Sequence, residues 1–432
     1  MLKRIFLYCF YQFARGICAL LNFGFFKEVA VRNKQYLHTA LPQIISSHHP
    51  NAFMDVSIVG VHSPYTLYML ANAGLFKSKF ANWFFNTFYC IPIERPQDTN
   101  GRPINNVGNF RRSTQHLTNG GVLFIASEGT SIFERRLKPL KTGMARIALI
   151  AERENNYQLG LSIIPMCLHY TAPTEFRSSV LLNVGKPMRV ADWQELNESD
   201  NYAAVNQLTD AVERVMRDLL IHTDTAEQAI LLEQVETLVQ NDKPLNVAGV
   251  FDRTQTLLRW LQQLSAEQYS TIEKSCEKYF STLKQLQLSD VAFAEKKYNV
   301  VRQRILLVVL FPLYVIAWLM NAPPCYLANY MVKALGFDVV YEATIKAITG
   351  LVFFIIYYLL QIIFIYKIFL YKFALLYLLL LIPMGLFAWW YRAQWKLYAA
   401  HRQKKRAVTK EHYDDIIRLR RDIIHQLPDS VT

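Results

Sequence analysis

Residues 41–55 read LPQIISSHHPNAFMD, where a short apolar run leads into two histidines and then into a second apolar segment. The run at 41–45 predicts a short strand, and residues 52–61 predict the beginning of a helix. His49 then lies at a strand-to-helix turn, with five residues between it and Asp55. Turns of this kind lie at the edge of an α/β sheet where sites are built. The stretch therefore predicts an α/β fold with a site at this edge.

His49 and Asp55 are the residue types of a general base and its orienting partner. A neutral imidazole can take a proton from a hydroxyl, and an aspartate at its other nitrogen fixes the tautomer and stabilises the imidazolium. Taken alone, a histidine before a proline is more often a helix-cap or core residue. His48, His49 and Asp55 could also hold a metal ion, but no further ligand spacing supports a metal site. The pair is therefore a hypothesis that depends on neighbouring motifs.

Strand-like and helix-like runs alternate over residues 29–191, which predicts one α/β domain there. The further strand-like runs are residues 121–126, 162–166 and 180–184, and residues 144–152 carry helical spacing. Residues 192–303 contain four segments with apolar residues at three- and four-residue spacing and charges between them. We expect an amphipathic helical region there, serving as a connector.

A membrane region is predicted at residues 304–391, where Leu, Ile, Phe, Tyr and Val dominate. Its candidate segments are 305–320, 349–366 and 373–390. If all three spanned, the basic residues before and after the region would lie on opposite sides, against the positive-inside rule. We therefore expect 305–320, which contains Pro312, to be re-entrant or interfacial, with spanning as the alternative. The last two segments then form a C-terminal membrane hairpin.

The two ends of the chain are also predicted to lie at the membrane. Residues 1–28 place Lys3 and Arg4 before an apolar stretch, which predicts an uncleaved, interfacial membrane-associated helix rather than a secretion signal. A buried helix of the folded domain is the alternative. Residues 392–432 predict a basic tail on the cytoplasmic side.

The net charge of +13 suits nucleic acid, an anionic bilayer or an anionic substrate. The apolar C-terminal third favours the last two, and no basic-aromatic stripe indicates a nucleic-acid partner. The six cysteines contain no C-x-x-C pair, so neither a zinc site nor a disulfide framework is indicated. Reduced, structural thiols fit a catalytic region in the cytoplasm.

Four motifs follow one another in a specific order. They are HPNAFMD at 49–55, IPIER at 91–95, FIASEGTS at 124–131, and IPM at 164–166 followed by VGKP at 184–187. This arrangement resembles the glycerophospholipid acyltransferase family, which includes bacterial glycerol-phosphate and lysophosphatidate acyltransferases. The resemblance covers roughly residues 25 to 190, and the order is more specific than any single motif.

The resemblance implies a glycerolipid acyltransferase-type mixed sheet flanked by helices, with His49 as general base and Asp55 as its partner. It also implicates Arg95, Glu128 and Gly129 in acceptor binding and site structure. The other substrate-binding candidates are Asn51, Ser127, Thr130, Ser131, Arg135, Arg136 and Lys141. Backbone N–H groups near Gly129 and Thr130 are candidate donors to a developing oxyanion.

The sequence departs from the usual family pattern at two places. The gap between His49 and Asp55 is five residues rather than four, which is similar to the subgroup of fungal glycerol-3-phosphate/dihydroxyacetone-phosphate acyltransferases. Ser131 stands where many lysophosphatidate acyltransferases have arginine, and Ile132-Phe133 replaces the His-Asp that typically follows. We expect Arg135, Arg136 or Lys141 to supply the positive charge for a phosphate instead.

Together these features predict a membrane-bound O-acyltransferase of phospholipid biosynthesis. It would move a fatty acyl group from acyl-CoA or acyl carrier protein, as co-substrate, to glycerol-3-phosphate or 1-acyl-glycerol-3-phosphate. Direct attack on the thioester needs no protein nucleophile, metal or cofactor. The alternatives are a lyso-aminolipid acceptor and a non-catalytic membrane scaffold. The expected location is a membrane, the inner or cell membrane in a bacterium, with the catalytic domain on the cytoplasmic face and membrane lipids as partners.

Overall fold

The computed structural model describes residues 2–95, 102–295, 298–369, 371–407 and 410–431. The chain divides into two compact units, which are described separately. The first comprises Met1–His222 with Asp338–Thr344, and the second Thr223–Phe337 with Ile345–Thr432.

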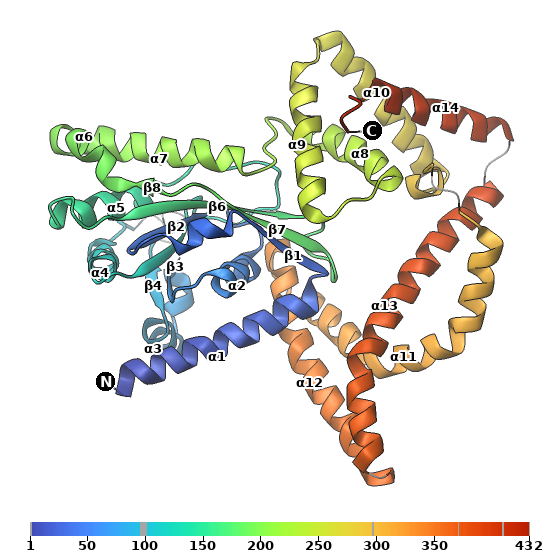
Figure 1. Cartoon of the computed structure of the whole chain (residues 1–432), viewed down its shortest axis with the longest axis horizontal. Helices are drawn as coiled ribbons and strands as arrows, with labels where there is room; N and C mark the ends of the chain where they lie inside the picture. The colour runs from blue at the N-terminus through green and yellow to red at the C-terminus, as the bar shows by residue number, and fades with distance from the viewer. Residues whose placement is uncertain (1, 96–101, 296–297, 370, 408–409, 432) are drawn as a thin grey trace. The chain divides into compact units, whose positions relative to one another are not determined.

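A mixed sheet is the centre of the first unit, with the strand order β1-β7-β6-β2-β5-β3-β4 and β8 beside β6 (Figure 1). The strands are β1 (Glu28–Arg32), β2 (Gln43–Ser47), β3 (Leu67–Asn72), β4 (Cys90–Ile93), β5 (Val122–Ala126), β6 (Ser162–Tyr170), β7 (Ser179–Val184) and β8 (Met188–Arg189). β6, β2, β5, β3 and β4 run parallel, whereas β7 and β8 are antiparallel to β6. This sheet, flanked by helices, confirms the predicted α/β class.

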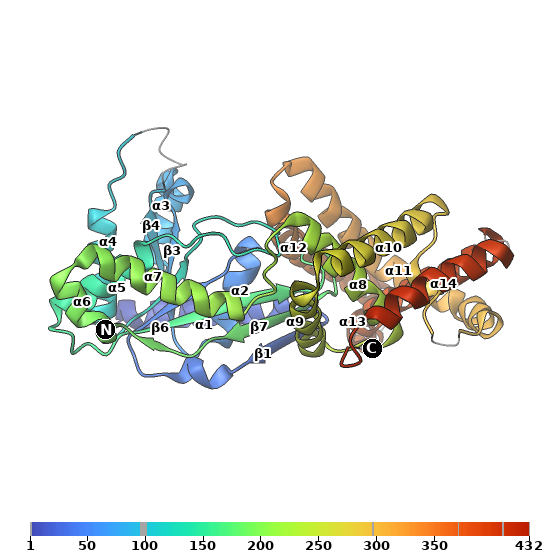
Figure 2. The ribbon, with the colours of Figure 1, turned by 90° about the horizontal axis from the view of Figure 1, so that it is seen from above.

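Helices cover both faces of the sheet because its central strands are apolar on both sides. They are α1 (Leu2–Phe25), α2 (Ala52–His62), α3 (Lys79–Thr87), α4 (Val107–Thr118), α5 (Gly143–Glu154), α6 (Gln194–Ser199) and α7 (Asn201–Asp218). Ile44, Leu123 and Ile163 share one face in register and belong to a core with α4, α5 and α7. α1 and α2 pack together on the opposite side. In Figure 2, which looks from the side of α7, that helix lies in front of the sheet.

One strand is longer than the sequence predicts, and the difference matters for the site. The strand expected at 162–166 continues to Tyr170 because β7 pairs with it over its second half, up to the pair Tyr170 and Val180. This antiparallel pairing depends on a segment further along the chain, so the local pattern does not show where β6 ends.

The second unit contains α8 (Ala226–Asp242), α9 (Val247–Gln263), α10 (Ala266–Gln285) and α14 (Lys410–Gln426). The first three correspond to helical segments predicted within residues 192–303, and α14 lies in the predicted tail at 392–432. The remaining predicted segment is α7, which belongs to the first unit. Arg420 of α14 forms ion pairs with Asp242, at 2.9 Å, and with Asp290, at 2.8 Å. The hydroxyl of Tyr279 donates to Asp290 at 2.6 Å. These buried, paired charges join α14 to the helices that precede it in the chain.

Three long apolar helices complete the second unit: α11 (Val300–Leu335), most of α12 (Glu342–Ile368) and α13 (Tyr371–Ala407). With α1, the described residues contain four helices long and apolar enough to cross a membrane. α11 continues through Pro323 and Pro324 to Leu335 and is longer than the predicted segment 305–320. Whether it re-enters or spans stays a prediction.

The prolines of α11 explain how α12 joins it. A proline has no N–H, so Pro323 and Pro324 leave the carbonyls of Leu319 and Met320, four residues earlier, without their helical donors. Side chains of α12 replace them: Tyr357 Oη donates to Leu319 O at 2.9 Å. Gln361 Nε2 donates to Met320 O at 3.1 Å. An unpaired carbonyl is costly in an apolar environment, so these bonds stabilise the α11–α12 contact.

A polar cluster lies next to these hydrogen bonds. It consists of Asn321, Tyr358, Gln361 and Tyr377 and is called the Asn321 cluster. Tyr358 donates to Asn321 Oδ1 at 2.6 Å, and Asn321 Nδ2 donates to Ala317 O of its own helix at 3.0 Å. Tyr377 of α13 donates to Gln361 Oε1. The cluster therefore links α11, α12 and α13 through side-chain hydrogen bonds.

Candidate active site

The site lies at the carboxyl edge of the parallel strands. Ser47, the last residue of β2, is in register with Ala126, the last residue of β5, and with Met166 of β6. Residues 48–51 and the loop after Ala126 therefore begin side by side. Parallel strands bring the residues that follow them to one edge of the sheet, where α/β proteins place their sites.

His49 and Asp55 face each other across the turn between β2 and α2. His49 Nδ1 lies 3.1 Å from Asp55 Oδ2. The imidazole is 18% exposed, whereas the carboxylate is fully buried. Asp55 lies in the first turn of α2, where the helix dipole stabilises a negative charge, and Asn51 N donates to its Oδ2 at 2.6 Å. This arrangement suits an accessible base with a fixed carboxylate.

Tyr170 is a site residue that sequence reasoning missed. Its hydroxyl donates to Asp55 Oδ1, the oxygen that does not face His49. Burial, together with the neighbouring carboxylate of Asp55, raises the pKa of Tyr170 well above 10, so the hydroxyl stays protonated and remains a donor. The sequence carries only a weak signal for this residue. Strand β6 continues beyond Met166 and ends at Tyr170.

Glu128 connects the segment that contains His49 to the loop that follows β5. Its side chain is buried, and Oε2 accepts from the backbone N–H of His49 at 3.3 Å. Oε1 accepts from the backbone N–H of Lys138 at 2.8 Å. The carboxylate thus fixes the histidine segment against the loop that follows β5.

His48, the neighbouring histidine, is placed differently. It is only 3% exposed, and its Nε2 lies 3.9 Å from Glu128 Oε2. Burial lowers the pKa of His48, although the nearby carboxylates of Glu128 and Asp55 oppose this effect. Because His48 is more buried than His49, the geometry favours His49 as the accessible base.

Gly129, in the loop that follows β5, contacts Arg95. Gly129 has a φ of +70°, a left-handed conformation that glycine adopts without strain. Its carbonyl accepts from Arg95 Nη1 at 2.7 Å. Its N–H donates to Ala126 O at 3.0 Å and closes the turn. That backbone N–H groups near Gly129 and Thr130 serve an oxyanion stays a prediction. Arg95 contacts the loop from the end of β4.

The remaining candidates lie along residues 127–141. Ser127 is buried, with its Oγ 2.6 Å from Ser46 Oγ, and its carbonyl accepts from Lys141 N at 2.7 Å. Thr130, Ser131 and Arg135 are partly buried, and Arg136 and Lys141 are exposed. Asn51 is buried, and its Nδ2 donates to Pro173 O at 2.9 Å, so it contributes to the structure of the site.

The match to known proteins covers this part of the chain. Residues 28–169 match the family model described as Acyltransferase. This part of the chain is therefore similar to that family. The match confirms the resemblance inferred from the four motifs.

Two known proteins are similar to parts of the chain. Glycerol-3-phosphate O-acyltransferase 1 of Saccharomyces cerevisiae is 25% identical over 134 residues, which are 30% of this chain. The match spans 17% of that yeast protein's length. The crystal structure of the 1-acyl-sn-glycerophosphate acyltransferase PlsC from Thermotoga maritima aligns with a TM-score of 0.36 and 16% identity. That alignment covers 48% of this chain and 78% of PlsC.

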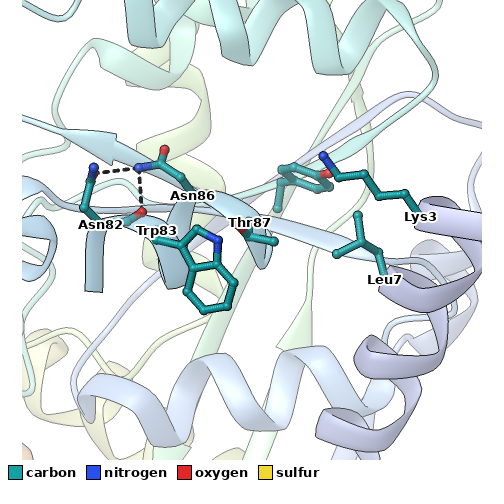
Figure 3. Close-up of a pocket in the computed structure, with 7 residues that line it drawn as sticks. Lys3, Leu7, Asn82, Trp83, Asn86 and Thr87 are labelled. Atoms are coloured by element: carbon teal, nitrogen blue, oxygen red, sulfur yellow. Dashed lines mark hydrogen bonds between the residues drawn. The ribbon is translucent and has the colours of Figure 1, made fainter. Parts of the chain in front are cut away.

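The first unit also has a cleft away from His49. It has a volume of about 490 Å³ and lies between α1, β3 and α3 (Figure 3). Its lining residues are Lys3, Leu7, Tyr68, Asn82, Trp83, Asn86 and Thr87, and none of these was a predicted site residue. Within the described residues, no group of three or more His, Cys, Asp or Glu side chains could hold a metal ion.

Proposed function

We propose that this protein is a membrane-bound O-acyltransferase that transfers a fatty acyl group from a thioester donor to a glycerol-phosphate acceptor. The observation that carries the proposal is the 3.1 Å approach of His49 Nδ1 to the buried carboxylate of Asp55, with the imidazole partly exposed. An acceptor hydroxyl can reach such an imidazole, and the buried carboxylate can stabilise the imidazolium that forms.

The reaction needs one proton transfer and one displacement. The Nε2 atom of His49 takes the proton of the acceptor hydroxyl as the oxygen attacks the thioester carbonyl. The C–S bond then breaks, the thiolate of CoA or acyl carrier protein leaves, and the proton of His49 passes to it. Asp55 holds the imidazole in the tautomer whose Nε2 is free to accept. The acyl ester and the free thiol are the products.

The charges near the site favour an anionic acceptor. Arg136 and Lys141 are exposed on the loop after β5, and Arg135 is partly buried there. Arginine and lysine side chains donate to phosphate oxygens. We therefore place glycerol-3-phosphate and 1-acyl-glycerol-3-phosphate first among acceptors. Ser131, which lacks such a charge, supports the lyso-aminolipid alternative.

The apolar helices fit a lipid product. Four helices of the described chain could cross a membrane by length and composition, so a diacylated product could pass directly into the bilayer. The basic tail at 392–432 favours the cytoplasmic face for the catalytic domain by the positive-inside rule.

Product analysis by mass spectrometry tests this proposal. The full chain, purified in detergent, is given acyl-CoA or acyl-ACP with glycerol-3-phosphate, lysophosphatidate and a lyso-aminolipid in competition. We expect acylated phosphate-bearing products. Products from the lyso-aminolipid alone would replace the proposed acceptor class, and no acylated product from any acceptor would refute the acyltransferase proposal.

Two histidine variants identify the base. His49→Ala should abolish product formation while the circular dichroism spectrum remains that of the native protein. His48→Gln should retain most of the activity, because His48 is buried away from solvent. An active His49→Ala protein would exclude His49 as the base.

A further inference from the structure

The end of β6 and the segment that connects it to β7 contact the candidate active site. β6 ends at Tyr170, opposite Val180 of β7. The hydroxyl of Tyr170 donates to Asp55, and Pro173 O, in the connection itself, accepts from Asn51 Nδ2 at 2.9 Å. One hairpin therefore contacts both the residue before α2 and the carboxylate in its first turn.

The two oxygens of Asp55 have separate partners. Oδ2 accepts from Asn51 N at 2.6 Å and lies 3.1 Å from His49 Nδ1. Oδ1 accepts from the hydroxyl of Tyr170. Because the carboxylate is fully buried, it needs hydrogen bonds in place of water, and these partners fix its rotation from two directions.

The ring of Tyr170 is itself held in place. It packs against Phe26, which is almost fully buried, with 5.9 Å between the ring centroids. A ring packed in this way presents its hydroxyl at a fixed position. The contact therefore extends from a core aromatic residue through Tyr170 to Asp55.

We propose that Tyr170 is a positioning residue of the acyl-transfer reaction, whose hydroxyl holds Asp55 against His49 and tunes the proton affinity of the imidazole. The proposal rests on the proposed function. By donating to Oδ1, the hydroxyl withdraws negative charge from the carboxylate. Without this donor, the carboxylate keeps more of its negative charge and stabilises the imidazolium more strongly.

Among the described residues, Asp55, Glu128 and His48 are titratable groups next to His49, and Tyr170 contacts Asp55. Glu128 accepts from the backbone N–H of His49, and His48 lies next to Glu128. Neither contact involves the hydroxyl of Tyr170. Replacing Tyr170 by phenylalanine therefore changes the partners of Asp55 and leaves these two groups where they are.

Steady-state kinetics of Tyr170→Phe in the full-length protein give the first test. We expect kcat to fall about tenfold, a part of the roughly 10²- to 10⁴-fold contribution of a general base. KM for the acceptor should stay unchanged, and the acid limb of the pH–rate profile should move up by about half a unit. In an Asp55→Asn background, Tyr170→Phe should have little further effect. An unchanged kcat and pH profile would overturn the proposal.

Tyr157→Phe is a matched control. The hydroxyl of Tyr157 is also buried and accepts from Asn197 Nδ2 at 2.7 Å, but it contacts no site residue in the described structure. We expect Tyr157→Phe to lower the unfolding temperature without a shift of the pH profile. An equal shift in both variants would show that Tyr170 acts only through stability.

A measurement without substrate separates this proposal from the proposed function. Diethylpyrocarbonate modifies neutral histidine, and tandem mass spectrometry gives its rate at His49 as a function of pH. We expect the midpoint to rise in Tyr170→Phe and to stay constant in Tyr157→Phe. If the wild type transfers no acyl group, the proposed function fails although the midpoint shifts. If it transfers acyl groups and the midpoint does not shift, the positioning role fails.

Discussion

Two polar clusters of this protein, each built around one buried side chain, Asp55 or Asn321, have different surroundings. The Asp55 cluster, formed by His49, Asn51, Asp55 and Tyr170, surrounds a carboxylate and leads to an imidazole that is 18% exposed. The Asn321 cluster lies among apolar helices, and its hydrogen bonds end on helix carbonyls or on other members. One cluster fixes a group that faces outward, and the other joins helices. Similar hydrogen bonds therefore hold a partly exposed imidazole in place in one region and join helices in the other.

Among the variants of the two clusters, Asp55→Asn is expected to have the largest effect on turnover. Asp55→Asn keeps the shape of the side chain but removes the charge that stabilises the imidazolium. We expect kcat to fall by roughly 10²- to 10⁴-fold, with the native circular dichroism spectrum retained. Single-turnover assays of acyl transfer measure this. Near-normal turnover would mean that the Asp55 cluster, like the Asn321 cluster, serves only structure.

Glu128 should have a smaller effect. Glu128→Gln turns one of its two acceptor oxygens into a donor that faces a backbone N–H of His49 or Lys138. We expect about a tenfold loss of activity, the equivalent of one buried hydrogen-bonding group left unsatisfied. Glu134→Gln is the control, because Glu134 is 46% exposed and pairs only with Lys138 among the described ion pairs. Equal losses in both variants would contradict a specific role for Glu128.

Changes in the Asn321 cluster should lower the stability of the protein and leave its turnover unchanged. Asn321→Leu leaves the hydroxyl of Tyr358 without its acceptor, and we expect a loss of about 1 kcal/mol in the free energy of unfolding. The matched control is Asn329→Leu: Asn329 is exposed on the same helix, and its Nδ2 donates to the carbonyl of Cys325, four residues earlier. Unfolding in detergent followed by circular dichroism compares them. Equal stability of the two variants would remove the assembly role of the cluster.

The effect expected from His48 is on stability and depends on pH. Burial lowers its pKa below 6.5, although Glu128 and Asp55 oppose this, and His49 adds to it. The unfolded chain therefore binds this proton at a higher pH than the folded protein does. Stability should fall as the pH drops below about 6.5, by at most about 1.4 kcal/mol per unit. His48→Gln should flatten this slope in denaturant titrations at pH 5 to 7, and an unchanged slope would assign it to other groups.

The sequence predicts the frame of the site because the central strands are short apolar runs. Parallel strands buried on both faces lose the alternating pattern but keep such runs, so β2, β5 and the first half of β6 are recognisable. The residues that follow them, His49 and Glu128, then meet at one edge. The roles of His49, Asp55 and the other site residues stay predictions until the variants are measured.

Tyr170 and the Asn321 cluster could not be predicted in the same way. The end of β6 depends on its pairing with β7, and local propensity does not fix such pairings. The carbonyls freed by Pro323 and Pro324 can be counted from the sequence, but their donors come from α12, whose packing side is not encoded in a uniformly apolar helix. Contacts between distant segments decide both features.

The proline pair also has a consequence for biogenesis. Without α12, the carbonyls of Leu319 and Met320 lack the donors that Tyr357 and Gln361 supply, and each unsatisfied carbonyl in a bilayer interior costs several kcal/mol. A newly synthesised α11 would therefore be unstable in the lipid phase on its own. Its lasting insertion would have to wait until translation delivers α12, so that the two segments mature as one unit.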